Sequence, residues 1–154
     1  MAQTVHGKID GRDRRVTVVV ARFNELVTDR LLHGALQALR RAGVAEDAIR
    51  VVHVPGAFEL PQACRWASSS ADAVVALGCV IRGATDHYEY VCAQAARGIL
   101  DAGLESGVPM GFGLLTCETL EQALDRAGGK VGNKGADATL AALEMLGVSD
   151  ALSD

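Results

Sequence analysis

The sequence predicts an open, doubly wound α/β fold, in which helices cover both faces of a four-stranded parallel sheet. Four short apolar runs alternate with longer stretches of helical periodicity. The runs are nearly continuous rather than alternating, which is typical of strands buried on both faces of a parallel sheet. The chain has 154 residues, of which 49% are hydrophobic and 22% charged, a composition that suits one domain with its own core.

Each element has a signal of its own. The run VTVVVA predicts a buried first strand, and the helix after it carries leucines at helical spacing and stops at Gly43. Asp86 with Glu89, and Thr119 with Gln122, match the capping-box pattern at the starts of two later helices. We expect strands at 16–21, 49–54, 73–80 and 108–116, and helices at 25–42, 59–69, 86–104, 119–127 and 136–146.

The stretch before Arg14 does not fit this core. It could be a disordered tail, or a strand added to the sheet of another subunit. We therefore divide the chain into an N-terminal arm at 1–14 and a single α/β domain at 15–154.

The composition argues against several classes of protein. The net charge of −4 gives no sign of a nucleic-acid-binding face or a polybasic membrane patch. The longest apolar stretch, 73–81, is far shorter than the ~20 residues of a membrane span, and the N-terminus has no apolar signal-peptide core. The four cysteines form no CxxC pair, so we expect reduced packing residues in a cytoplasmic protein, with no disulfide and no metal site.

The loops after the four strands are the candidate site, because ligands bind at the carboxyl ends of strands in open α/β sheets. Phe23 follows the first strand and Phe58 the second. Either ring could simply plug the end of the core, but a phenylalanine in both loops favours a planar ligand stacked there. Glu59 is either a carboxylate placed at a helix N-terminus or an acceptor for ligand hydroxyl and N–H groups.

The loop after the third strand is the most informative. Gly83 and Ala84 permit close backbone approach, and Thr85 opens a long helix whose N-terminus is a ready anion site. His87 lies in the first turn of that helix. A lone histidine is more often structural, but an imidazole beside an anion cradle is placed for proton transfer, because it changes charge near neutral pH.

Positive charge gathers in the last third of the chain, where Arg126 precedes the glycine-rich segment GGKVGNKG with Lys130 and Lys134. These side chains are either solvated charges or a phosphate-binding group. The spacings GxxxxGK[ST] and GxGxxG are absent, which argues against a mononucleotide or dinucleotide domain. Together these residues predict a flavodoxin-like α/β enzyme that acts on a heterocycle and a small phosphorylated compound.

Six segments resemble the lumazine synthase family, and they occur in the family's order. They are ARFN at 21–24, VPGAFELP at 54–61, ALGCVIRGATDHYEYV at 76–91, GLLT at 113–116, EQA at 121–123 and GNKG at 132–135. The resemblance implies a transferase of riboflavin biosynthesis that joins 5-amino-6-(D-ribitylamino)uracil to 3,4-dihydroxy-2-butanone 4-phosphate in the penultimate step, without a cofactor. The rivals are a binding protein for riboflavin or lumazine without turnover, and an archaeal-type riboflavin synthase.

The resemblance also assigns roles to residues, all numbered here in this sequence. It implies that His87 transfers protons and that Phe23 stacks on the pyrimidine. The expected substrate-binding residues are Phe23, Asn24, Ala57, Phe58, Glu59, Cys79, Val80, Ile81, Phe112 and Lys134, and the expected phosphate-binding residues are Ala84, Thr85 and Arg126.

Phe112 lies before the end of the fourth strand, where the strand-end rule gives it no role. The resemblance implies that it reaches into the site of a neighbouring subunit, so that the protein would be a homo-oligomer built from pentamers. Family members stay as pentamers, pair as decamers or form icosahedral shells of sixty subunits. The short break around 128–130 carries no insertion, which favours the shell-forming members.

Overall fold

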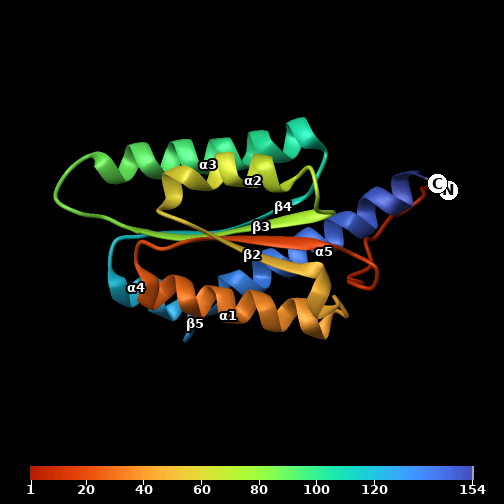
Figure 1. The fold of residues 1–154 in the computed structure, drawn as a ribbon, viewed down its shortest axis with the longest axis horizontal. Coiled ribbons are helices and arrows are strands. Elements are labelled where there is room, and N and C mark those ends of the chain that lie inside the picture. The colour runs from red at the N-terminus through yellow and green to blue at the C-terminus, as the bar shows by residue number, and fades with distance from the viewer. Residues whose placement is uncertain (154) are drawn as a thin grey trace.

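The computed structural model describes residues 1–153 and confirms the predicted fold class. A four-stranded sheet has the order β2-β1-β3-β4, and all three pairs of neighbouring strands are parallel. Helices α2 and α3 cover one face, and α1, α4 and α5 cover the other (Figure 1). The elements are β1 (Val16–Ala21), α1 (Glu25–Arg41), β2 (Ile49–Val54), α2 (Leu60–Ala67), β3 (Ala73–Ile81), α3 (His87–Ser106), β4 (Met110–Cys117), α4 (Leu120–Asp125), β5 (Ala127–Gly129), β6 (Gly132–Asn133) and α5 (Lys134–Ser153).

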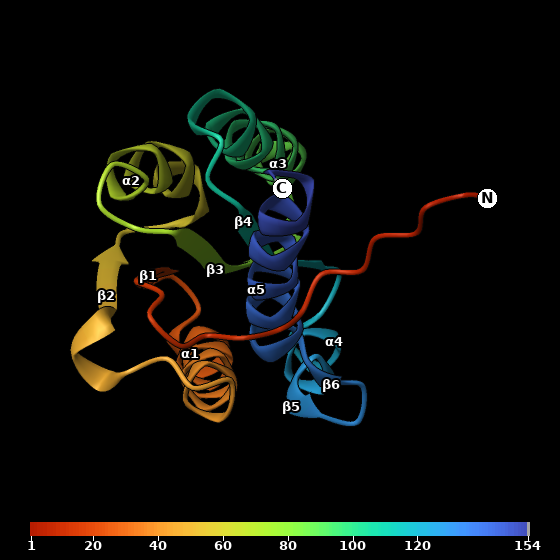
Figure 2. The same ribbon diagram turned by 90° about the vertical axis from the view of Figure 1, so that its right-hand side faces the viewer.

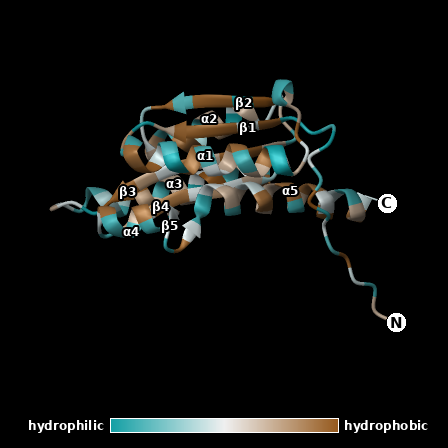
Figure 3. Ribbon diagram, turned by 90° about the horizontal axis from the view of Figure 1, so that it is seen from below, coloured by the Kyte–Doolittle hydropathy of each residue, from teal (hydrophilic) through white to brown (hydrophobic). Residues whose placement is uncertain are grey.

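The sheet divides the core into two apolar layers, because successive side chains of a strand point to opposite faces. In β1, Val18 and Val20 pack against α1 and α5, whereas Val19 packs against α2 and α3. The strands are the hydrophobic centre of the molecule in Figure 3. Three of the four cysteines are buried and all four are free thiols, as predicted. Burial raises the pKa of the Cys64 and Cys79 thiols to about 12, so both stay neutral.

Of the two predicted helix caps, one is confirmed and the other is wrong. Thr119 caps α4 as expected, since its hydroxyl oxygen accepts from the Gln122 N–H at 3.1 Å. The prediction for Asp86 is wrong, because this residue is itself in a helical conformation and its side chain makes no capping hydrogen bond. An N-cap side chain reaches the first turn from an extended backbone, which Asp86 does not have.

The last third of the chain differs most from the prediction. The glycine-rich break forms a small antiparallel hairpin of β5 and β6, and α5 begins at Lys134 rather than at 136. Asn133 sets that start, since its side-chain oxygen accepts from the N–H groups of Gly135 at 2.8 Å and Ala136 at 3.1 Å. The helix then continues to Ser153, seven residues beyond the predicted end.

The N-terminal arm crosses α5 and then leaves the body of the molecule (Figure 2). The crossing is close, because a Cβ atom at Gly7 would lie 2.2 Å from the Glu144 carbonyl oxygen. A Cβ atom at Gly147 would lie 2.5 Å from the backbone of Lys8. Arg14 also forms an ion pair with Asp150 of α5. Within residues 1–153, no helix has the length and apolarity that crossing a bilayer requires.

Candidate active site

A hollow of about 520 Å³ lies where the loops after β1 and β2 meet the first turns of α3. This is the carboxyl edge of the sheet, where open α/β proteins bind their ligands. The hollow combines residues from three separate segments of the chain. They are Phe23, Gly56, Ala57, Phe58, Glu59, His87, Tyr90, Val91 and Gln94.

The ring of Phe23 is positioned by its own backbone and by Gly56. Its N–H donates to the Pro55 carbonyl oxygen at 3.0 Å, which joins the first two loops. A Cβ atom at Gly56 would lie 2.5 Å from Cδ2 of the ring, so only glycine leaves room for it there. Phe23 and Phe58 are each 65% exposed. Neither ring plugs the core, and both can stack on a planar ligand.

Glu59 ends a short 3-10 turn, Ala57–Glu59, that leads directly into α2. It occupies the N-cap position of α2, but its side chain makes no capping hydrogen bond. Glu59 therefore stands at a helix N-terminus, where the dipole favours a carboxylate, and it also lines the hollow. In the hollow, the carboxylate can accept hydrogen bonds from hydroxyl or N–H groups of a ligand.

Asn24 has a structural contact that the sequence did not reveal. It adopts a left-handed conformation with φ 66°, and its side-chain NH₂ donates to the Cys79 carbonyl oxygen at 2.7 Å. This hydrogen bond ties the first loop to β3. Asn24 is not among the residues that line the hollow. The Cys79 side chain is buried, whereas Val80 and Ile81 are half-buried at the end of β3.

The loop 82–86 places Ala84 and Thr85 in solvent just before α3. His87 is the first residue of this helix, and it faces the hollow. Because Asp86 does not cap α3, the first N–H groups of this 20-residue helix have no side-chain acceptor from that position. Free N–H groups and the helix dipole together favour an anion there.

Besides Gly56, three residues of α3 line the hollow and were missed by the sequence analysis. Tyr90, Val91 and Gln94 follow His87 at intervals of three, four and seven residues, so they share one face of α3. That spacing is visible in the sequence and could have identified them. They give this wall of the hollow a phenol, an aliphatic side chain and a carboxamide.

Nine of the expected site residues do not line this hollow within one chain: Asn24, Cys79, Val80, Ile81, Ala84, Thr85, Phe112, Arg126 and Lys134. The last three have contacts elsewhere. Arg126 turns back on α4, where its Nη1 donates to the Gln122 carbonyl oxygen at 2.9 Å. The Lys134 ammonium lies 3.7 Å from Asp137, and its backbone N–H donates to the Arg126 carbonyl oxygen at 2.8 Å. Phe112 is half exposed on β4.

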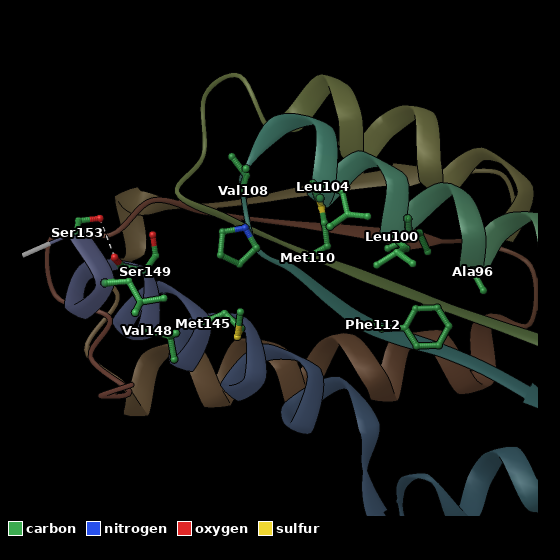
Figure 4. Close-up of a pocket in the computed structure, with 15 residues that line it drawn as sticks. Ala96, Leu100, Leu104, Val108, Met110, Phe112, Met145, Val148, Ser149 and Ser153 are labelled. Carbon is green, nitrogen blue, oxygen red and sulfur yellow. Dashed lines mark hydrogen bonds between the residues drawn. The ribbon is translucent and has the colours of Figure 1, made fainter. Parts of the chain in front are cut away.

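Phe112 instead lines a second, apolar groove of about 710 Å³ between α3 and α5 (Figure 4). Leu100 and Leu104 of α3 and Met145 of α5 contribute to its walls, and the start of β4 forms its floor. Leu104 is 74% exposed, although it is surrounded by apolar neighbours. An exposed apolar surface of this kind marks an interaction site in a folded protein.

The fold and the hollow define a doubly wound α/β protein with an aromatic, acidic and imidazole-bearing site at the carboxyl edge of its sheet. A family profile described as 6,7-dimethyl-8-ribityllumazine synthase matches residues 13–150. Curated proteins of that name are similar to this chain over most of its length. Those of Desulfovibrio desulfuricans and Desulfatibacillum aliphaticivorans are each 47% identical over 152 residues, which cover 97% of this chain. The same alignments cover 97% of the Desulfovibrio protein and 98% of the Desulfatibacillum protein. That of Halorhodospira halophila is 53% identical over 137 residues, or 88% of each chain.

The chain therefore belongs to the 6,7-dimethyl-8-ribityllumazine synthase family, an enzyme family of riboflavin biosynthesis.

Proposed function

We infer that this chain condenses 5-amino-6-(D-ribitylamino)uracil with 3,4-dihydroxy-2-butanone 4-phosphate, giving 6,7-dimethyl-8-ribityllumazine, inorganic phosphate and water. The observation that carries this inference is the meeting of Phe23, Glu59 and His87 in one hollow, in a chain matched by the family over residues 13–150. These three side chains offer a stacking face, a hydrogen-bond acceptor and a proton carrier. The reaction needs one of each.

The pyrimidine substrate takes the part of the hollow after β1 and β2 in this proposal. Phe23 stacks on its ring, while Ala57, Phe58 and Glu59 hold the ribityl chain. The backbone at Val80 and Ile81 reads the ring edge. Asn24 contributes by holding the carbonyl of Cys79 in place, as its 2.7 Å hydrogen bond indicates.

The phosphorylated substrate takes the N-terminus of α3. Ala84, Thr85 and the uncapped N–H groups of the helix offer hydrogen-bond donors to its phosphate. The phosphate then lies beside His87, which starts the same helix. The substrate's carbonyl carbon is thereby brought towards the amine of the pyrimidine.

Chemistry follows from this placement. The amine attacks the carbonyl, and the adduct loses a first water to form an imine. Phosphate is then eliminated, and the ring closes with loss of a second water. Each step moves a proton, so one imidazole near the reacting atoms can serve several of them. Holding two substrates in register can contribute up to ~7–11 kcal/mol by itself.

The test is to mix the purified protein with both substrates and follow the fluorescent lumazine. We expect formation well above the uncatalysed rate, and no product when the four-carbon phosphate is omitted. A folded protein that binds riboflavin but forms no lumazine would overturn the proposal in favour of a binding protein without turnover.

We also propose that the active site is completed by a second copy of this chain. The hollow lies on one side of α3, with Tyr90 and Gln94, and the apolar groove lies on another, with Leu100 and Leu104. Two different faces that meet head to tail close into a ring when the rotation permits. A neighbour's groove edge would bring Phe112 to the hollow, and its α4 and α5 would bring Arg126 and Lys134 towards the phosphate.

The ring we propose is a pentamer, and the short hairpin at 127–133 is compatible with assembly of pentamers into a larger shell. The arm at 1–14 extends from the domain at 15–154 and is free over its first residues to contact another subunit. We propose a cytoplasmic location, where the reduced thiols described above would persist.

Mixed rings test the shared site. His87→Ala and Arg126→Ala subunits are each expected to have low activity alone. An equal mixture of the two variants would be unfolded and reassembled. About a quarter of the sites should then be intact, because a site in a head-to-tail ring needs His87 from one subunit and Arg126 from its neighbour, and each is intact in half of the subunits. If both residues act within one chain, mixing restores nothing.

A further inference from the structure

Arg82 joins three elements at the carboxyl edge of the sheet. Its Nε lies 3.0 Å from Oε1 of Glu118, in the loop after β4. Its Nη1 lies 3.5 Å from Oε1 of Glu89, in the first turn of α3. The guanidinium also stands over the ring of Tyr88, with Cζ 4.4 Å from the ring centre. Its backbone N–H donates to the Cys117 carbonyl oxygen at 2.9 Å, which continues the β3–β4 pairing by one bond.

The partner that Arg82 holds is itself fixed. The backbone N–H of Glu118 donates to the side-chain oxygen of Gln122 at 2.8 Å. The Gln122 N–H in turn donates to Thr119, the N-cap of α4. A rigid, capped helix start therefore presents the Glu118 carboxylate to Arg82.

The loop that follows Arg82 has little else to hold it. Among the described residues 1–153, residues 83–85 form no hydrogen bond with another part of the chain. A Cβ atom added at Gly83 would find no neighbour within 4 Å. The position of Thr85 therefore depends on how the two ends of the loop are anchored. Arg82, the first residue of the loop, is tied to Glu118. The same guanidinium contacts Glu89 and Tyr88, which follow the loop in α3, and so it links the two ends of the loop.

We propose that Arg82 is a positioning residue for the phosphorylated substrate: it holds the loop 82–86 so that Thr85 and the N-terminus of α3 face the phosphate. This inference rests on the proposed function of that loop. Two carboxylates offset the charge of Arg82, so it acts through the geometry of the loop rather than by attracting the phosphate. Arg82 needs its ion pair with Glu118 to hold the loop in this position.

The kinetic test compares Arg82→Gln and Glu118→Gln with the unaltered protein. Exposed charged pairs contribute modestly, so we expect the KM for the four-carbon phosphate to rise about fivefold in each variant. The KM for the ribitylaminouracil should stay within about twofold, because Phe23 and Glu59 do not depend on this loop. The double variant should be no worse than either single one, and Arg82→Lys should recover part of the loss.

Arg40→Gln is the matched control. Arg40 forms a similar exposed pair with Glu46, at 2.7 Å, between the end of α1 and the turn before β2. Its loss should leave both KM values unchanged. Equal increases in both KM values for Arg82→Gln would show a general structural role and overturn the inference. Stronger phosphate binding in Glu118→Gln would also overturn it, since that result means that a freed Arg82 contacts the phosphate directly.

Hydrogen exchange tests the same inference without any turnover. The protected amides at the two ends of the loop belong to Arg82 and Glu89, which donate to the carbonyl oxygens of Cys117 and Asp86. Both should exchange faster in Arg82→Gln and in Glu118→Gln than in the unaltered protein or Arg40→Gln. Unchanged exchange there would refute the positioning role. Failure of the unaltered protein to form lumazine would count against the proposed function alone, because the exchange result is independent of it.

Discussion

The substitution Gly56→Ala tests the proposal that the hollow holds the pyrimidine against Phe23. The added Cβ atom would lie 2.5 Å from Cδ2 and 2.9 Å from Cε2 of the Phe23 ring. Van der Waals contact requires about 3.5 Å or more between carbon atoms, so the ring must retreat by roughly 1 Å. The Phe23 backbone cannot follow, since its N–H is bound to Pro55 at 3.0 Å.

The retreat should affect binding and hardly affect folding. Phe23 is 65% exposed and has room to swing outwards, and Gly56 has φ −153°, which alanine adopts without strain. The free energy of unfolding should change by less than about 0.5 kcal/mol. A displaced ring loses its stacking, about 0.5–1.5 kcal/mol, which corresponds to a Kd for the ribitylaminouracil about 2- to 12-fold higher.

A double-mutant cycle makes this prediction specific. Equilibrium binding of the ribitylaminouracil would be titrated for Gly56→Ala, Phe23→Ala and the double variant. If Gly56 acts only by leaving room for the ring, adding Gly56→Ala to Phe23→Ala should change nothing further. Equal losses in both backgrounds would refute the reasoning and place the effect in the backbone of the loop.

Three further predictions follow from the same structure. His87→Ala should lower kcat by about 10²-fold or more yet leave lumazine formation measurable, because orientation of the two substrates persists; complete loss with intact pyrimidine binding would contradict this. Leu104→Glu should shift the protein to smaller species in light scattering and lower its activity, because a carboxylate in the apolar groove opposes burial of the groove against a second subunit. An unchanged mass would contradict the proposed interface. Burial raises the pKa of the Cys64 and Cys79 thiols to about 12, so the stability they contribute is fully present below their ordinary range near pH 9 and is lost as pH rises towards 12. The free energy of unfolding, measured by urea denaturation, should therefore fall by about 1.4 kcal/mol for each thiol between pH 8 and pH 10, and by less in Cys64→Ala.

The sheet and its helices could be predicted because apolar periodicity is a local signal. Each strand of the sheet is an uninterrupted apolar run, and β1 matches its predicted bounds. The hairpin of β5 and β6 could not be foreseen, since its strands have three and two residues and are rich in glycine. The end of α5 was also missed, because Gly147 looks like a helix stop but is instead the place where the arm crosses closely.

The site was predictable where it depends on strand ends and not where it depends on tertiary contacts. Phe23, Glu59 and His87 meet because their loops follow from the order of the elements. The hydrogen bond from Asn24 to Cys79 joins residues 55 positions apart, so no local pattern encodes it. Asp86 shows the opposite case: the sequence has a good capping pattern, but the side chain of Asp86 makes no capping hydrogen bond at the start of α3.

The most direct test of the central claim is the stoichiometry of the reaction. The unaltered protein would be mixed with both substrates while lumazine fluorescence and inorganic phosphate are recorded together. We predict that the two products appear in equal amounts and at the same rate, and that omitting either substrate abolishes both. Phosphate released without lumazine, or neither product from a folded protein that binds the ribitylaminouracil, would contradict condensation at this site.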